Sequence, residues 1–186
     1  MDLSFFLEQK QLFTIMHVFS VVVGMGAAFV TDILFTLFAS NRTLSRFEIS
    51  VIRFLSRVVM IALGFIIVTG FCIFLSDTDK YLNSAKFLTK MTVIAVLSIN
   101  GALLHFYVFK HLSDKNYLTN KKSIPARKIS FALGSISFVS WTTALSLGVL
   151  DKITIPYLYA VSIYLSAVIC GILFSQIILQ QFSKRN

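Results

Sequence analysis

The chain has 186 residues, of which 56% are hydrophobic and 13% are charged. A soluble domain of average composition carries about 25% charged residues, so this composition excludes a soluble enzyme, a disordered chain and a disulfide scaffold. The mean hydropathy of +0.82 is typical of a protein that crosses a membrane several times. The net charge of +9 is not accompanied by a basic face with interleaved aromatic residues, so we expect no nucleic-acid partner.

Five apolar stretches follow one another along the chain. Each contains the roughly 20 apolar residues that a helix needs to cross a hydrocarbon core about 30 Å thick. The stretches are continuous rather than alternating, which disfavours a β-barrel, and in lipid only helices or closed barrels satisfy the backbone. The sequence therefore predicts one all-α domain over residues 1–186, an integral membrane bundle of five transmembrane helices with the lipid bilayer around it. The helices are predicted at about 11–39, 50–75, 87–109, 129–150 and 156–182.

Ionisable side chains inside apolar helices are costly in lipid, and for that reason each is a candidate functional group. The first three predicted helices contain six of them, whereas the last two helices contain them only at their ends. We therefore expect a polar intramembrane site between helices one to three. The six residues are His17, Asp32, Arg53, Arg57, Lys90 and His105.

The depth of these residues in the membrane follows from the rise of 1.5 Å per helical residue. His17 and Asp32 are about 22 Å apart along the first helix, and Lys90 and His105 are equally far apart along the third. The two helices run in the same direction, so His17 and Lys90 share the outer layer, and Asp32 and His105 share the inner layer. This difference in depth excludes a haem whose iron is bound by both His17 and His105.

The inner layer is predicted to hold a polar network. Asp32 and Arg57 lie at equal depth across the first helical hairpin, where a carboxylate and a guanidinium in a low dielectric should form a bidentate pair. This pair is either a packing clamp or part of a functional site. Asn100 lies near the middle of the membrane, where an unpartnered amide is costly, and with Gly101 it is expected to contact a neighbouring helix. The predicted network is completed by His105.

The outer layer offers a second candidate site, formed by His17 and Lys90. His17 either hydrogen-bonds to a neighbouring helix or acts as a haem iron ligand, another metal ligand or a proton relay. Lys90 either extends to the lipid headgroups or anchors a carboxylate beside His17. Below them, the small residues Gly24 and Ala28 let another helix or a flat ligand approach closely.

Three segments resemble a group of small bacterial membrane proteins and, more distantly, the HemJ-type protoporphyrinogen oxidases and the CopD-like membrane domains. In HemJ-type proteins, an early His in helix one and a Lys that opens a later helix form the functional pair, and haem b is bound. The resemblance therefore implies haem b, with His17 as the axial metal ligand and Lys90 as the propionate partner. It covers about the first 110 residues, and the chain departs from the HemJ-type pattern by carrying Gly24, Gly26 and Asp32 after its His. The segments run from Met16-His17-Val18 to Asp32, over Leu55-Ser56-Arg57, and from Lys86 to Asn100-Gly101.

Three functions remain open from the sequence. The first is a multi-pass protein of the bacterial inner membrane with a haem b or redox site at His17. The second is a transporter or channel component, in which Asp32, Arg57 and His105 line a path for protons, ions or a small solute. The third is a non-catalytic subunit of a membrane complex, whose basic segment 110–128 docks an acidic partner or anionic lipid. Homo-oligomers and membrane complexes are both compatible with these readings, and no reaction is assigned.

The uneven distribution of Lys and Arg predicts the orientation of the chain. Twelve of these residues lie at the cytoplasmic end assigned by the positive-inside rule, and five lie at the other. The N-terminus is therefore expected outside and the C-terminus in the cytoplasm. A reporter that works only in the cytoplasm should be active when fused after Asn186 and inactive when inserted within 76–85. The opposite pattern of activities would invert this orientation.

Overall fold

The computed structural model describes residues 4–40, 45–108, 123–151 and 153–184, and every regular element in this part of the chain is a helix. Five spans are long and apolar enough to cross a membrane: α2, α3, α5 together with η1, α7, and α8. The predicted all-α fold and the predicted number of membrane-length helices are thus confirmed. The elements are α1 (Ser4–Glu8), α2 (Lys10–Ser40), α3 (Arg46–Leu75), α4 (Thr78–Leu82), α5 (Ala85–Leu103), the π-helix η1 (Leu104–Val108), α7 (Ile124–Val149) and α8 (Tyr157–Lys184).

Two helices begin four or five residues earlier than their apolar stretches predict, and each has a signal for a helix start at its N-terminus. α3 begins at Arg46 rather than at 50, since Ser45 and Glu48 form a capping box. The Ser45 hydroxyl accepts from the Glu48 N–H at 3.2 Å, and the Glu48 carboxylate accepts from the Ser45 N–H at 2.7 Å. α7 begins at Ile124 rather than at 129, with Pro125 in its first turn, where a missing N–H costs nothing.

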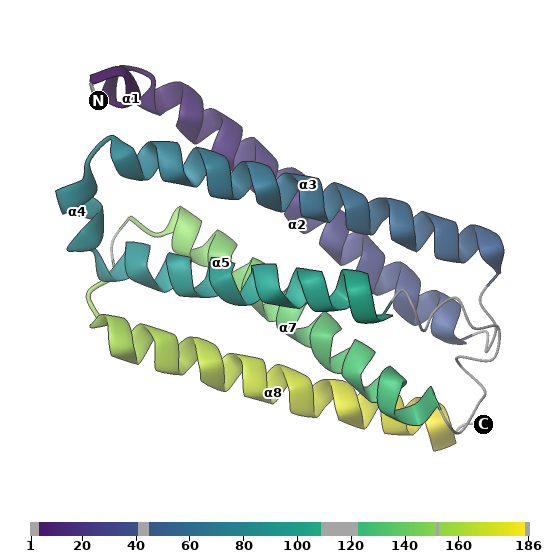
Figure 1. Cartoon of the computed structure of the whole chain (residues 1–186). Coiled ribbons are helices and arrows are strands. Elements are labelled where there is room, and N and C mark those ends of the chain that lie inside the picture. Colours follow the sequence, from purple (N-terminus) through teal and green to yellow (C-terminus); the bar gives the residue numbers. More distant parts are fainter. Residues whose placement is uncertain (1–3, 41–44, 109–122, 152, 185–186) are drawn as a thin grey trace.

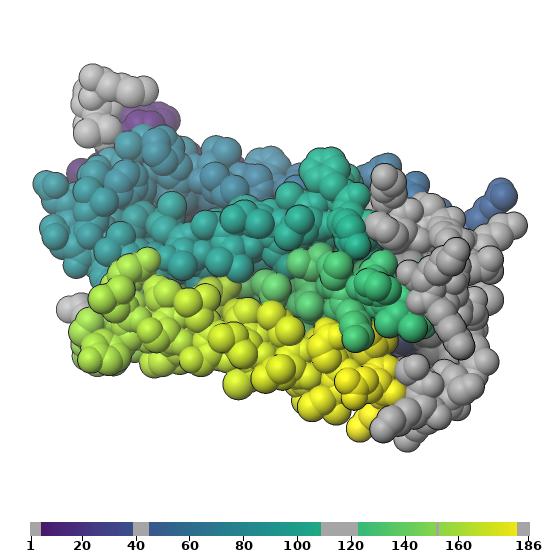
Figure 2. Space-filling view, turned by 60° about the horizontal axis from the view of Figure 1, so that its bottom comes forward, coloured from purple at the N-terminus to yellow at the C-terminus, as the bar shows by residue number. Residues whose placement is uncertain are grey.

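The membrane-length helices form two groups (Figure 1). α2 and α3 pack against each other as an antiparallel hairpin, and α5, α7 and α8 form a three-helix group. Figure 2 shows α8, in yellow, running alongside α5 and α7 on one face of the molecule. The α1 end of the chain and the last turn of α8 lie at opposite ends of the bundle, as an odd number of crossings requires.

Interhelical hydrogen bonds hold the three-helix group together. The hydroxyls of Ser140 on α7 and Tyr164 on α8 are 2.8 Å apart and buried, and those of Thr92 on α5 and Tyr157 on α8 are 2.9 Å apart. Outside these pairs, most Ser and Thr hydroxyls of the described helices donate to a carbonyl oxygen of the preceding turn, for example Thr143 to Val139 at 2.8 Å. Such local bonding satisfies polar side chains within an apolar surrounding.

Close packing of α7 on α2 joins the two groups. Trp141 of α7 is only 1% exposed, and it belongs to a core cluster that includes residues of α2, α3 and α5. A Cβ added at Gly24 of α2 would lie 2.7 Å from Trp141 Cη2 and 3.0 Å from the Ala62 Cβ. The small-residue face of α2 is therefore packed against another helix, α7, at Gly24. The sequence predicted that either a helix or a flat ligand would approach this face. The rings of Phe29 and Phe138 stack nearby, with centroids 4.9 Å apart.

The outer surface of the bundle is apolar. Large side chains stand exposed on different helices, including Phe19 at 68%, Phe65 at 52% and Leu158 at 73%. An apolar surface of this extent is unfavourable in water and is typical of a protein that lies in lipid. The protein thus has the architecture of a multi-pass membrane protein.

The contact at Gly24 generates a stability prediction. Gly24→Ala should destabilise the protein by about 1–3 kcal/mol, because the new methyl group would overpack against the Trp141 ring. Gly26→Ala is the matched control, since a Cβ at Gly26 meets nothing within 4 Å. Thermal unfolding of the two purified variants in detergent is the measurement. Equal melting temperatures for both variants would contradict the described approach of α7 to α2.

Candidate functional site

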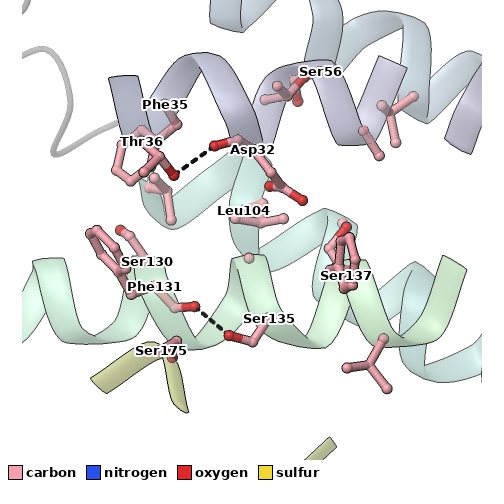
Figure 3. A pocket seen from close by; sticks show the side chains of 18 of the residues that line it. Asp32, Phe35, Thr36, Ser56, Leu104, Ser130, Phe131, Ser135, Ser137 and Ser175 are labelled. Atoms are coloured by element: carbon pink, nitrogen blue, oxygen red, sulfur yellow. Dashed lines mark hydrogen bonds between the residues drawn. The ribbon is translucent and has the colours of Figure 1, made fainter. Parts of the chain in front are cut away.

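A cavity of about 500 Å³ lies between the α2–α3 hairpin and the three-helix group. A volume in this range accommodates a small organic ligand. Its lining combines apolar and aromatic side chains with one carboxylate and several hydroxyls, as Figure 3 shows. The polar lining residues are Thr31, Asp32, Thr36, Ser56, Ser130, Ser135, Ser137 and Ser175.

Asp32 is the one residue with an ionisable side chain among those that line this cavity. In Figure 3 its carboxylate leaves α2 and points into the space in front of α7. The atom Oδ2 is buried and has no hydrogen-bond partner in the part of the chain that the structure describes. The other oxygen faces Gly134 of α7, where an added Cβ would lie 3.7 Å from Oδ1. A methyl group at position 134 would therefore just contact a carboxylate for which no described residue provides a counter-charge.

Most of the lining hydroxyls already donate their proton in a hydrogen bond within the protein. Five of them donate to a backbone carbonyl of their own helix at 2.7–3.0 Å. A hydroxyl that donates in this way keeps lone pairs that can accept a hydrogen bond from a ligand. The polar groups of the cavity lining are thus mainly hydrogen-bond acceptors for a ligand. The five donors are Thr31, Thr36, Ser130, Ser135 and Ser175.

The predicted ion pair between Asp32 and Arg57 is not formed. Arg57 is exposed on α3 and is absent from the cavity lining, while Asp32 Oδ2 has no hydrogen-bond partner among the described residues. The neighbouring Ser56 lines the cavity instead. Equal depth did not bring the two groups together, because one residue step turns a helix by about 100° and carries Arg57 to the outside.

The other members of the predicted inner network are also separate from Asp32. Asn100 is 3% exposed, and neither Oδ1 nor Nδ2 has a hydrogen-bond partner among the described residues. The adjoining Gly101 does approach α3, since an added Cβ would lie 3.3 Å from the sulfur of Met60. His105 lies in η1 with its ring edge-to-face against Phe106, and it does not line the cavity.

In the outer layer, His17 is tied to the partner helix of its own hairpin. Its Nδ1 lies 3.0 Å from the hydroxyl of Thr69 on α3, and an added Cβ at Gly70 would lie 3.3 Å from its Cε1. The expected interhelical hydrogen bond of His17 is therefore present. Lys90 of α5 is partly buried and lies near enough to interact electrostatically with the imidazole.

These contacts can be compared with what haem b requires. An axial His usually binds iron through one ring nitrogen while the other is held by a second group. The Thr69 hydroxyl holds Nδ1 of His17, and the backbone of Ile66 also forms a hydrogen bond with the ring. Neither of the two described cavities includes His17 or Lys90. Haem binding at this pair therefore stays a prediction.

Sequence reasoning missed the contribution of the last two helices, because it followed ionisable residues and these helices contain them only at their ends. α7 and α8 supply about half of the residues around the cavity. A signal was present on α7, where Ser130, Gly134 and Ser137 recur at helical spacing and so share one face. The predicted docking segment 110–128 lies largely outside the described residues.

The site thus consists of one unpaired acid in a partly open, largely apolar cavity at the junction of two helix groups. Such a site can bind a proton, a cation or a hydrogen-bond donor. Comparisons with protein-family models, with curated proteins and with solved structures find no match for this chain.

Proposed function

We propose that this protein is a transporter or channel component, and that a proton or a small solute binds at the Asp32 cavity on its way across the membrane. The observation that carries the proposal is the carboxylate of Asp32, with its buried and unpartnered Oδ2, facing a cavity of about 500 Å³. A carboxylate in the middle of a membrane helix costs about 2.5–3.5 kcal/mol on insertion scales. Two states avoid that cost: the protonated acid and the carboxylate paired with a bound cation.

The position of the cavity also supports transport. Aromatic rings line it where the two helix groups meet, and Phe35 and Phe131 pack edge-to-face with centroids 5.8 Å apart. Within the three-helix group, by contrast, hydrogen bonds such as Ser140 to Tyr164 join the helices. Apolar contacts between two internally tied groups are compatible with rocking of one group against the other, which is how many transporters expose a central site.

The proposal includes the setting of the protein. We infer a multi-pass protein of a bacterial inner membrane, with the N-terminus outside and the C-terminus in the cytoplasm. The support is the excess of Lys and Arg in alternate connecting segments of the sequence and the apolar exterior of the helices. The lipid bilayer is its immediate partner. A second copy or another membrane protein is compatible with this setting, and transport does not require either.

The proposed role of Asp32 predicts a trade between activity and stability. Asp32→Asn should abolish proton flux and leave the melting temperature unchanged or raise it, because the amide removes a buried acid that has no ion-pair partner among the described residues. Flux is measured in proteoliposomes that contain a pH-sensitive dye, with a K⁺ diffusion potential set by valinomycin. Arg57→Gln is the matched control, since Arg57 is exposed and lies outside the cavity lining.

The proposal would be abandoned if wild-type proteoliposomes showed no more proton flux than protein-free liposomes. It would also be abandoned if Asp32→Asn retained the full wild-type rate. A large loss of melting temperature in Asp32→Asn would show instead that the carboxylate has a stabilising partner, contrary to its unpartnered Oδ2.

A second candidate function is haem b binding in the outer layer, favoured by the hydrogen bond between His17 Nδ1 and Thr69. Haem would supply redox chemistry there. His17 would hold the iron through Nε2, and Lys90 would attract a propionate.

The haem candidate is tested by the optical spectrum of protein purified from haem-replete cells. A Soret band should be present in the wild type and lost in His17→Ala. In Lys90→Ala the band should be weaker, and in His105→Ala it should be unchanged, since His105 lies about 22 Å deeper along the parallel helix. A colourless wild-type protein would eliminate this candidate.

A further inference from the structure

We infer that the ligand of the Asp32 cavity is a monovalent organic cation that joins one ammonium-type head to an apolar body. The inference rests on the proposed function and deepens it, because it names the class of solute. Three features of the cavity lead to it: the charge of its one ionisable residue, the direction of its hydrogen bonds and the nature of its remaining lining.

The charge of the lining sets the sign of the ligand. Asp32 is acidic, and no Lys, Arg or His is among the residues described around the cavity. A carboxylate or phosphate ligand would face Asp32 without any cation to offset the repulsion. A single positive charge would balance the single carboxylate, and its N–H groups would reach the unpartnered Oδ2 in a charge-assisted hydrogen bond.

The hydrogen-bonding direction of the hydroxyls points to a donor. Five of the seven lining hydroxyls donate to their own helices. The lone pairs of Thr31, Thr36 and Ser135 can therefore accept from a ligand, whereas Ser175 already accepts from Gln176 Nε2 at 3.4 Å. Only Ser56 and Ser137 have no described hydrogen bond within the part of the chain that the structure covers. A head group rich in N–H donors matches this acceptor-rich surface, whereas a ligand rich in acceptors would leave polar atoms unsatisfied.

The remainder of the lining defines the body of the ligand. Phe35, Phe131, Phe138 and Phe174 contribute aromatic rings, and branched aliphatic side chains such as Ile52 complete the wall. An inorganic cation needs several oxygen ligands or its water shell, which such a wall does not replace. An apolar body would bury its own surface against these groups, and a ring face near the cation would add attraction.

The test compares three probes that share one body and differ in their heads: 3-phenylpropylammonium, 3-phenylpropan-1-ol and 3-phenylpropanoate. Binding of each to the detergent-purified full chain is measured by calorimetry at neutral pH. The ammonium should bind at least about tenfold more tightly than the alcohol, and the carboxylate should bind most weakly. Asp32→Asn should remove the preference for the ammonium, and Asp32→Glu, which keeps the charge, should retain it.

A second variant keeps the test decisive if Asp32→Asn does not fold. Gly134→Val retains the carboxylate but fills the space beside it, since a Cβ at Gly134 meets nothing nearer than Asp32 Oδ1 at 3.7 Å. This variant should weaken ammonium binding at least about tenfold. Ammonium affinity that is unaffected by both Asp32→Asn and Gly134→Val would overturn the assignment of the ligand to this cavity.

Flux on the same preparations separates the two levels of the proposal. Asp32-dependent proton flux combined with an ammonium that binds no tighter than the alcohol would overturn the ligand class and leave the transport proposal intact. An ammonium preference that depends on Asp32, without any proton or solute flux, would overturn transport and leave the ligand class intact.

Discussion

The packing of the Trp141 ring against Gly24 sets the distance between the two halves of this protein. Because Gly24 has no side chain, α7 comes within van der Waals contact of α2 at this level, and the Ala62 methyl closes the contact from α3. The same cluster extends to Leu97 on α5, so one buried indole contacts or adjoins helices of both groups. Elsewhere along the same interface, Phe35 of α2 packs edge-to-face on Phe131 of α7, and both rings line the Asp32 cavity between the two groups.

The unpaired state of Asp32 distinguishes this cavity from the rest of the interior. Elsewhere, hydroxyls are satisfied within their own helices or across helices, as for Ser140 and Tyr164. Asn100 and Trp141 also have buried polar atoms without described partners, yet neither can carry charge. A membrane protein that retains a lone buried acid accepts a loss of stability, and such losses are typical of functional positions. The acid is therefore the strongest indication of function in the molecule.

The surroundings of His17 differ chemically from those of Asp32. His17 is held by Thr69 and packed beside Gly70, so its ring is confined by the hairpin to which it belongs. Lys90 belongs to α5, in the other helix group, and is partly buried. The inner cavity contains a carboxylate and no basic residue among its described lining.

The sequence by itself determined the helical class and the five membrane-length spans, because hydrophobic length and the rise per residue depend only on local chain geometry. It also identified His17, Asp32 and Lys90 as candidate functional residues. Tertiary structure alone decided which way each side chain faces. Arg57 is exposed on α3 whereas Asp32 lines the cavity, and it is the packing of the helices that brings Gly134 of α7 beside the Asp32 carboxylate. Rotation about the helix axis and the pairing of helices depend on contacts between distant segments, which no local pattern contains.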